Sequence, residues 1–277
     1  MRLVDSHCHV NADRFADDAD LVLGAARLAG VERILVPGWN VASSERAVEL
    51  AARLPWLDAA AGVHPHDAAK VDAAGWGRIV DLASSPGVIA IGETGLDYDR
   101  MFSPIDDQLV NLRRNLDLAL ATGRPAILHC RSSRGRRDAQ DALLAELQQA
   151  GVGERDEWRT AFADRPPVVV HSFSGPVDYA RGMLDLGAAI SFSGLVFRAG
   201  EEASADVAAL PPADRLLVET DSPFLAPPGA PRGRNEPEYV RITAAWLAER
   251  RATTSEALGA ALVDAYDRTF PHPGRAG

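Results

Sequence analysis

The amino-acid sequence predicts an α/β protein built as a closed (β/α)8 barrel. Short runs rich in aliphatic and β-branched residues alternate with longer segments of helical period, a pattern typical of parallel βαβ units. Eight such runs of similar, short length favour closure into a barrel, the architecture known for eight strand–helix repeats. An open, doubly wound sheet is the alternative arrangement of the same units.

The expected elements follow this alternation along the chain. The expected strands cover residues 3–5, 33–36, 57–62, 88–92, 125–129, 168–171, 189–192 and 216–219. The expected helices cover residues 17–29, 43–54, 73–84, 105–122, 138–150, 177–186, 203–209, 238–251 and 254–268. Ser43 is the expected N-cap of the second helix. Residues 151–167 are polar, mixed in charge and without a clear period, which predicts a surface excursion before the sixth strand.

Length and composition are those of one ordinary globular domain. The chain has 277 residues, of which 47% are hydrophobic and 25% charged, and one barrel of this kind needs about 250 residues. Because no linker-like segment interrupts it, we expect a single domain over 1–277. No signal peptide precedes the first strand and no apolar run approaches membrane-spanning length. We therefore expect a cytoplasmic protein with no membrane contact and no obligate protein partner.

The charge balance restricts the kinds of partner. The chain has 29 basic and 39 acidic residues, a net charge of -10 and a pI near 5.2. This composition argues against a broad basic surface that binds nucleic acid through counterion release. It does not exclude phosphate substrates, because bound divalent cations can reverse the sign of the field inside one pocket.

Histidines cluster just past the ends of the predicted strands. His7 and His9 follow the first strand at an i, i+2 spacing, which places both side chains on one face. Six of the seven histidines lie in such positions, namely His7, His9, His64, His66, His129 and His171, and the seventh, His272, lies in the tail. Active sites of (β/α)8 barrels are built from these loops. Ordinary strand capping predicts Asp, Asn, Ser and Gly there instead of imidazoles.

Two carboxylates join this set, and together the residues predict a metal centre. Glu93 follows the fourth strand and Asp221 the eighth. Imidazole and carboxylate ligands without thiolate suit ions such as Zn, Mn, Fe or Mg. Four histidines and two carboxylates exceed the needs of one tetrahedral ion, so we expect two divalent ions about 3.5–4 Å apart. The two oxygens of Glu93 would allow it to bridge them.

The order of these motifs resembles that of a known family. The segments DSHCH, GVHPH, GETGLDY, HCR, HSFSG and ETDSP, followed by RGRNEP at 232–237, resemble the TatD family of metal-dependent deoxyribonucleases over nearly the whole chain. The resemblance implies a TIM barrel that hydrolyses DNA phosphodiester bonds, as a 3′-5′ exonuclease acting on single-stranded or frayed ends. It implies two divalent ions, with Mg, Mn and Zn as the candidates.

The resemblance also assigns roles to individual residues. It implies that one metal is held by His7, His9, Glu93 and Asp221, and the other by Glu93, His129 and His171. His64 would contact the scissile phosphate, and Asp221 would also accept the proton of the attacking water. The chain departs from the family pattern in the helix before the fifth strand, where Gln108 is followed by Leu112 and Asn115 instead of an aromatic residue and a second glutamine.

Several residues near the predicted site have two interpretations. His66 is either a phosphate contact or the solvated end of a turn, and Asp97 either lines the cleft or caps the following loop. Trp39 either stacks on a base or packs, and packing is favoured. The arginines are either phosphate contacts, which we favour after the fifth strand, or a solvated face; they are Arg131, Arg134, Arg136 and Arg137, with Arg232 and Arg234 near the eighth strand.

Two other functions are compatible with parts of the pattern. An amidohydrolase-type barrel that cleaves amides or lactones would use similar ligands. Such barrels commonly bridge their metals with a carboxylated lysine, whereas this chain has Glu93, and the only lysine in the motif regions is Lys70. A barrel that has lost activity is the third possibility, and the intact ligand set argues against it.

Overall fold

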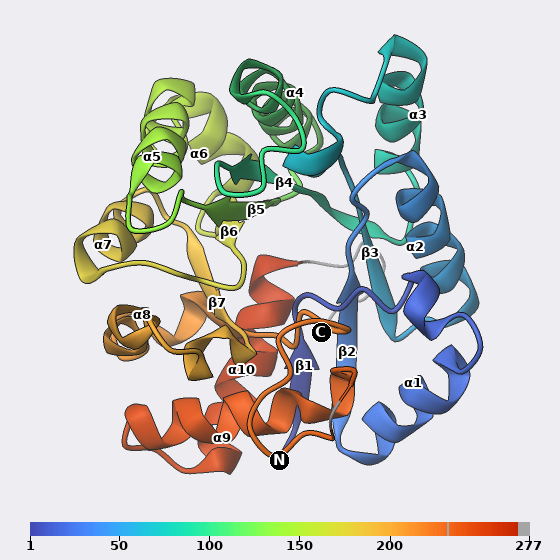
Figure 1. Ribbon diagram of the computed structural model, residues 1–277, viewed down its shortest axis with the longest axis vertical. Helices are drawn as coiled ribbons and strands as arrows, with labels where there is room; N and C mark the ends of the chain where they lie inside the picture. The colour runs from blue at the N-terminus through green and yellow to red at the C-terminus, as the bar shows by residue number, and fades with distance from the viewer. Residues whose placement is uncertain (232, 271–277) are drawn as a thin grey trace.

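Eight parallel strands form one sheet with the strand order β1 to β8, and helices surround it on the outside (Figure 1). The structure is a computed structural model that describes residues 1–231 and 233–270. The strands are β1 (Leu3–Asp5), β2 (Val31–Val36), β3 (Leu57–Ala61), β4 (Val88–Asp97), β5 (Ala126–Arg131), β6 (Val168–Val170), β7 (Ala189–Phe192) and β8 (Leu216–Val218).

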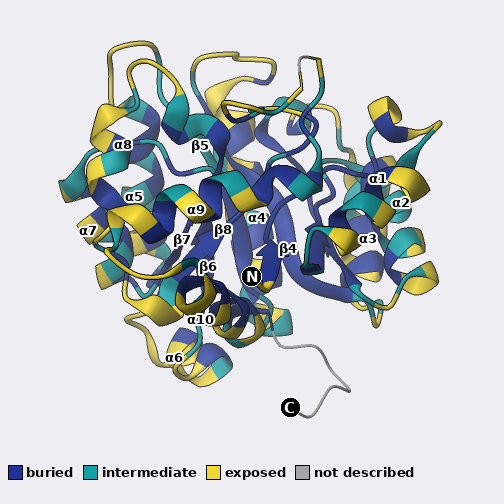
Figure 2. Cartoon of the chain, turned by 90° about the horizontal axis from the view of Figure 1, so that it is seen from below, coloured by how far each residue is buried: buried dark blue, intermediate teal, exposed yellow. Residues whose placement is uncertain are grey.

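The helices follow the strands in the predicted alternation. They are α1 (Ala19–Leu28), α2 (Val41–Arg53), α3 (Ala73–Ala83), α4 (Ile105–Thr122), α5 (Asp138–Ala150), α6 (Asp156–Phe162), α7 (Val177–Asp185), α8 (Glu202–Val207), α9 (Val240–Arg250) and α10 (Ser255–Thr269). The strands are buried on both faces and the exposed residues lie on the outer sides of the helices (Figure 2). This is the distribution expected when side chains fill the barrel and helices cover it. Among the described residues, no helix is long and apolar enough to cross a membrane.

The segments that follow β1 and β8 close the barrel. The Ser6 N–H donates to the Val218 carbonyl at 3.0 Å, and the Asp221 N–H donates to the His7 carbonyl at 2.9 Å. The buried Asp5 carboxylate also accepts hydrogen bonds from the N–H and hydroxyl of Thr220. The predicted (β/α)8 barrel is therefore confirmed, and the open sheet is excluded. Closure takes place at the segment that carries His7.

The expectation for residues 151–167 was wrong in one respect, because this segment contains α6. Trp158 and Phe162 lie one helical turn apart, are 3% and 2% exposed, and stack with ring centroids 5.4 Å apart. A helix of seven residues with two apolar anchors is too short to show a helical period. The indole N–H of Trp158 donates to the Ala150 carbonyl, which ties α6 to the end of α5.

Most element boundaries differ from the prediction by one or two residues, and two differences have a clear cause. The N-cap of α2 is Asn40, not Ser43: the two residues form a reciprocal capping box in which Ser43 occupies the third helical position. β4 runs beyond Gly92 to Asp97, so Glu93 lies within a strand. The sequence did not indicate this extension because Gly95 is unusual inside a strand. Its φ of 133° and its contact with the His129 carbonyl leave no room for a Cβ.

Candidate metal centre

Three groups of potential ligands converge at the carboxyl-terminal end of the barrel. Within each group one ligand atom of every member lies within 4.8 Å of the others. The groups are His7, Glu93 and His171; His7, His9 and Asp221; and His64, Glu93 and His129. The structure therefore brings together every predicted metal ligand, together with His64.

Glu93 lies at the centre and presents one oxygen to each side. Its Oε2 is 3.2 Å from His7 Nε2 and 3.5 Å from His9 Nε2. Its Oε1 faces three imidazole nitrogens: His64 Nε2 at 3.2 Å, His129 Nδ1 at 3.1 Å and His171 Nε2 at 2.9 Å. Glu93 is 2% exposed. A buried carboxylate whose two oxygens address two sets of imidazoles has the arrangement of a bridging ligand.

Asp221 completes the side on which His7 and His9 lie. Its Oδ1 is 3.4 Å from His9 Nε2 and 3.8 Å from His7 Nε2. The residue has a φ of 54°, and its N–H donates to the His7 carbonyl. This hydrogen bond joins the segment after β8 to the segment after β1, where the barrel closes. Two imidazole nitrogens, one oxygen of Glu93 and one of Asp221 thus converge from three strands.

Two carboxylates that the sequence analysis did not assign to the centre orient two of the imidazoles. The Nδ1 of His171 is 3.1 Å from Glu219 Oε1, and the Nε2 of His129 is 3.2 Å from Asp97 Oδ2. A carboxylate partner places the proton on the outer nitrogen and leaves the inner lone pair free for a metal. The inner nitrogens are those that face Glu93. The available signal was the position of Glu219 two residues before Asp221, and of Asp97 four residues after Glu93.

The ring proton of His64 lies on the opposite side from that of His129 and His171, on the nitrogen that faces Glu93. Its Nδ1 accepts the main-chain N–H of His66 at 3.0 Å, so the ring proton of the neutral imidazole must lie on Nε2. Burial lowers the pKa of His64 to about 4, which keeps the ring neutral near pH 7. The nitrogen that faces Glu93 Oε1 is therefore a donor, and His64 differs in this from His129 and His171.

The electrostatics of the cluster suit a divalent cation. Burial opposes ionisation of Glu93, but the nearby imidazoles, His171 and His64 first, hold the pKa of its carboxyl well below its ordinary value. Burial likewise opposes protonation of His171, yet Glu93 and Glu219 raise its pKa well above that of free imidazole. Buried carboxylates that draw protons onto adjacent imidazoles form a region of negative potential. A divalent cation would be stabilised by the same negative potential. The imidazoles would then be neutral and would bind the cation through their lone pairs.

The polar face of α4 supports the loops that carry this cluster. Gln108 accepts the Asp97 N–H at 2.8 Å and donates to the Ser103 carbonyl at 2.8 Å. The Asn111 side chain donates to the Val63 carbonyl at 2.6 Å, directly before His64. All of these α4 contacts are buried. Leu112 and Asn115, where the chain departs from the family pattern, are also buried in α4 and contact none of the ligands through a described hydrogen bond.

The structure settles the contacts of His66 and Asp97. His66 Nε2 donates to Asp97 Oδ2 at 2.7 Å. Asp97 Oδ1 accepts the N–H groups of Asp99 and Arg100 at 3.1 and 2.8 Å, so Asp97 caps the following loop as well as orienting His129. Trp39 packs beside His9 with the Arg46 guanidinium over its ring, as favoured.

Four of the arginines singled out in the sequence lie within 4.0 Å of a carboxylate oxygen. Arg137 pairs with Asp178 at 2.7 Å and Arg136 with Asp138 at 3.4 Å, while Arg131 lies 3.4 Å from Asp97. Arg234 forms two hydrogen bonds with Asp18, at 2.9 and 2.7 Å, and packs over Phe15. It anchors the segment after β8. Arg232 and His272 lie outside the described residues.

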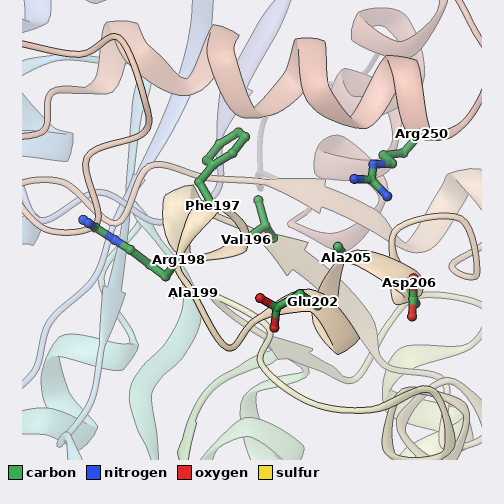
Figure 3. A pocket seen from close by; sticks show the side chains of 8 residues that line it. All are labelled: Val196, Phe197, Arg198, Ala199, Glu202, Ala205, Asp206 and Arg250. Atoms are coloured by element: carbon green, nitrogen blue, oxygen red, sulfur yellow. The ribbon is translucent and has the colours of Figure 1, made fainter.

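A pocket of about 480 Å³ lies apart from these ligands. Its walls come from the turn after β7, from α8 and from the end of α9 (Figure 3). Val196, Phe197, Arg198, Ala199, Glu202, Ala205, Asp206 and Arg250 line it. None of the candidate metal ligands lines this pocket. The candidate metal centre is therefore identified by the convergence of its side chains and not by this pocket.

Fold and site together define a metal-dependent hydrolase built on a (β/α)8 barrel. The model of the family TatD related DNase matches residues 4–271. The chain belongs to this family, and the predicted resemblance is confirmed.

Similar proteins cover almost the whole chain. The 3′-5′ ssDNA/RNA exonuclease TatD of Erwinia billingiae is 36% identical over 264 residues, which are 93% of this chain and 94% of that protein. The uncharacterized metal-dependent hydrolase YabD of Bacillus subtilis is 32% identical over 268 residues, 97% of this chain and 98% of that protein. The crystal structure of the TatD homolog YJJV from Escherichia coli superimposes with a TM-score of 0.83 at 29% identity, covering 98% of this chain and 99% of that one.

Proposed function

We propose that this protein is a divalent-metal-dependent nuclease that removes nucleotides from the 3′ end of single-stranded DNA, and of RNA as well. The observation that carries the proposal is the two-sided environment of Glu93, with His7 and His9 at one oxygen and His129 and His171 at the other. The polarity and the substrate are supported by the similar exonuclease of Erwinia billingiae.

The residues present fit two divalent ions, and Mg, Mn and Zn remain the candidates. His7, His9, Glu93 and Asp221 would hold the first ion, and Glu93, His129 and His171 the second. These are nitrogen and oxygen ligands whose outer partners, Glu219 and Asp97, orient the second set. When bound, the ions would neutralise the charge of a phosphodiester and lower the pKa of water to provide the nucleophile.

The protein's own groups would then position the substrate and move protons. His64 is neutral and carries its proton on Nε2, which lies 3.2 Å from Glu93 Oε1. When a metal binds that oxygen, the Nε2–H would donate to a non-bridging oxygen of the scissile phosphate instead. Asp221 is anionic because His9 and His7 outweigh the burial that opposes its ionisation and lower its pKa. Its carboxylate can accept the proton released by the attacking water. Glu93 stays ionised and keeps the two halves of the site at a fixed separation.

The amidohydrolase alternative is less well supported. A carboxylated lysine would be its usual bridging group, but Lys70 is the only lysine of the chain. The Lys70 ammonium is exposed and lies 2.6 Å from Asp67. In the proposed metal centre, Glu93 would be the bridging carboxylate.

The substrate test uses metal-stripped protein reloaded separately with Mg, Mn or Zn. Single-stranded oligonucleotides labelled at the 5′ or the 3′ end are offered beside a panel of amides and lactones. Digestion from the 3′ end shortens 5′-labelled strands progressively and releases the 3′ label at once as a mononucleotide. Internal cuts, digestion from the 5′ end or turnover confined to amides or lactones would contradict the proposal.

A further inference from the structure

Two phenylalanine rings lie exposed beside the two halves of the metal centre. Phe102, in the loop between β4 and α4, is 64% exposed, and Phe224, after β8, is 51% exposed. The ring of Phe102 meets His66 at a centroid distance of 4.7 Å and an interplanar angle of 88°. The ring of Phe224 meets His9 at 6.0 Å and 74°.

The two contacts fall on opposite sides of Glu93. His9 faces Oε2 of Glu93. His66 lies 4.3 Å from the ring of His64, which faces Oε1. Both phenylalanine contacts are steeply inclined, so neither ring lies flat against its histidine. A T-shaped contact with one histidine covers at most one face of a phenylalanine ring, and both side chains are more than half exposed.

The backbone that carries Phe102 is anchored on both sides. Before it, Asp97 caps the turn through the N–H groups of Asp99 and Arg100. After it, the buried Ser103 donates to the His66 carbonyl at 3.1 Å and accepts the Ala69 N–H at 3.1 Å. The exposure of Phe102 therefore results from a fixed loop.

Phe224 is anchored in a similar way. Its N–H donates to the Asp221 carbonyl at 2.8 Å, and its own carbonyl accepts the side chain of Asn235 at 2.7 Å. Asn235 is fully buried and also donates to the Thr220 carbonyl. A large apolar side chain that a fixed backbone holds in water is not stabilised by burial within its own chain. Both rings thus have the properties of a preformed contact surface.

We propose that Phe102 and Phe224 are stacking platforms for the two nucleobases on either side of the scissile phosphate. The inference rests on the proposed nuclease function and adds the site that holds the bases. Every nucleobase has a planar face, so aromatic platforms bind a single strand with little dependence on sequence. Stacking also adds affinity without a broad basic surface, which the net charge of -10 argues against. Trp39 is not part of this surface, because Arg46 covers its ring.

The test compares substrates that differ only in their bases. Wild type, Phe102→Ala and Phe224→Ala are assayed for kcat/KM on a single-stranded oligonucleotide and on the same strand with abasic tetrahydrofuran units at its two 3′-terminal positions. Stacking on one aromatic ring changes affinity about 5- to 150-fold. We expect wild type to prefer the base-bearing strand, and each alanine variant to reduce that preference by a factor in this range.

Matched variants separate stacking from loss of apolar bulk. Phe102→Tyr and Phe224→Tyr keep the ring and should keep the preference, whereas Phe102→Leu and Phe224→Leu should lose it. Leu28→Ala removes a 92% exposed apolar side chain from the end of α1 and should leave the preference unchanged. Circular dichroism and metal content confirm that each variant is intact.

The outcomes distinguish this inference from the function on which it rests. An active wild type whose preference is small, or survives both alanine substitutions, overturns the stacking platforms and leaves the nuclease standing. A wild type that cleaves none of the nucleic acid substrates overturns both.

Discussion

His171 and Glu219 form a buried pair in which Nδ1 of the imidazole lies 3.1 Å from Oε1 of the carboxylate. Glu219 is fully buried, and His171 is 5% exposed. The hydrogen bond fixes the ring so that Nε2 faces Glu93 at 2.9 Å. Glu219 is thus a positioning residue for one ligand of the proposed second metal.

Replacing Glu219 by Gln tests this pair. The amide keeps the size of the side chain and one acceptor oxygen but removes the negative charge that supports the imidazole. We expect metal affinity to fall about 10- to 100-fold, measured by competition with a chelating dye. Glu45→Gln, at an exposed carboxylate paired with Arg78, is the control and should not change affinity. Equal affinities in both variants and wild type would remove Glu219 from this role.

His64→Phe tests whether His64 is a donor to phosphate or a metal ligand. The phenyl ring keeps the approximate shape but cannot donate, and we expect unchanged metal content with single-turnover cleavage slower by about 100-fold or more. Elemental analysis and rapid-quench kinetics on one preparation provide both quantities. Loss of one bound ion would instead make His64 a ligand, as its place in a group with Glu93 and His129 also allows.

Asp221→Asn separates metal binding from proton transfer. Asparagine retains one ligating oxygen but loses the charge and the basic site, and general-base contributions are typically about 10²–10⁴ in rate. The variant should fold, retain at least one metal and bind DNA, yet cleave at least about 100-fold more slowly. A folded, metal-loaded variant that cleaves near the wild-type rate would exclude Asp221 from the chemistry.

The arginines after β5 are tested by salt dependence. Arg136 and Arg137 pair with carboxylates away from the candidate metal centre. Arg131 lies beside Asp97, which orients His129, so the variant replaces Arg131 and Arg134 by Ala. If both contact phosphate, DNA affinity should fall and the slope of log affinity against log salt should become less steep by about 0.7 per lost contact on single strands. Arg136→Ala is the control. An unchanged slope would assign Arg131 and Arg134 to the solvated surface.

The fold and the convergence of the candidate ligands were predictable because the signals are local. Strand–helix alternation gave the barrel, and an imidazole at a strand end, as in His7 or His171, needs no tertiary information to be noticed. The position of Glu93 between two sets of imidazoles agrees with the predicted bridging role. That prediction came from counting the candidate ligands against the needs of one ion.

Features that depend on tertiary contacts were not predictable. Glu219 and Asp97 lie close in sequence to Asp221 and Glu93, but only the folded chain shows that their partners are His171 and His129. The proton position on His64 depends on one main-chain N–H, that of His66. The exposure of Phe102 and Phe224 contradicts the usual burial of large apolar residues, so no pattern in the sequence indicates it.

The most direct test of the central claim is the dependence of cleavage on metal. Chelated protein, shown to be metal-free by elemental analysis, is titrated with Mn and assayed on end-labelled single-stranded DNA under single-turnover conditions. We predict no cleavage without metal and recovery of the full rate as two ions bind per chain. Full-rate cleavage by metal-free protein would contradict the account.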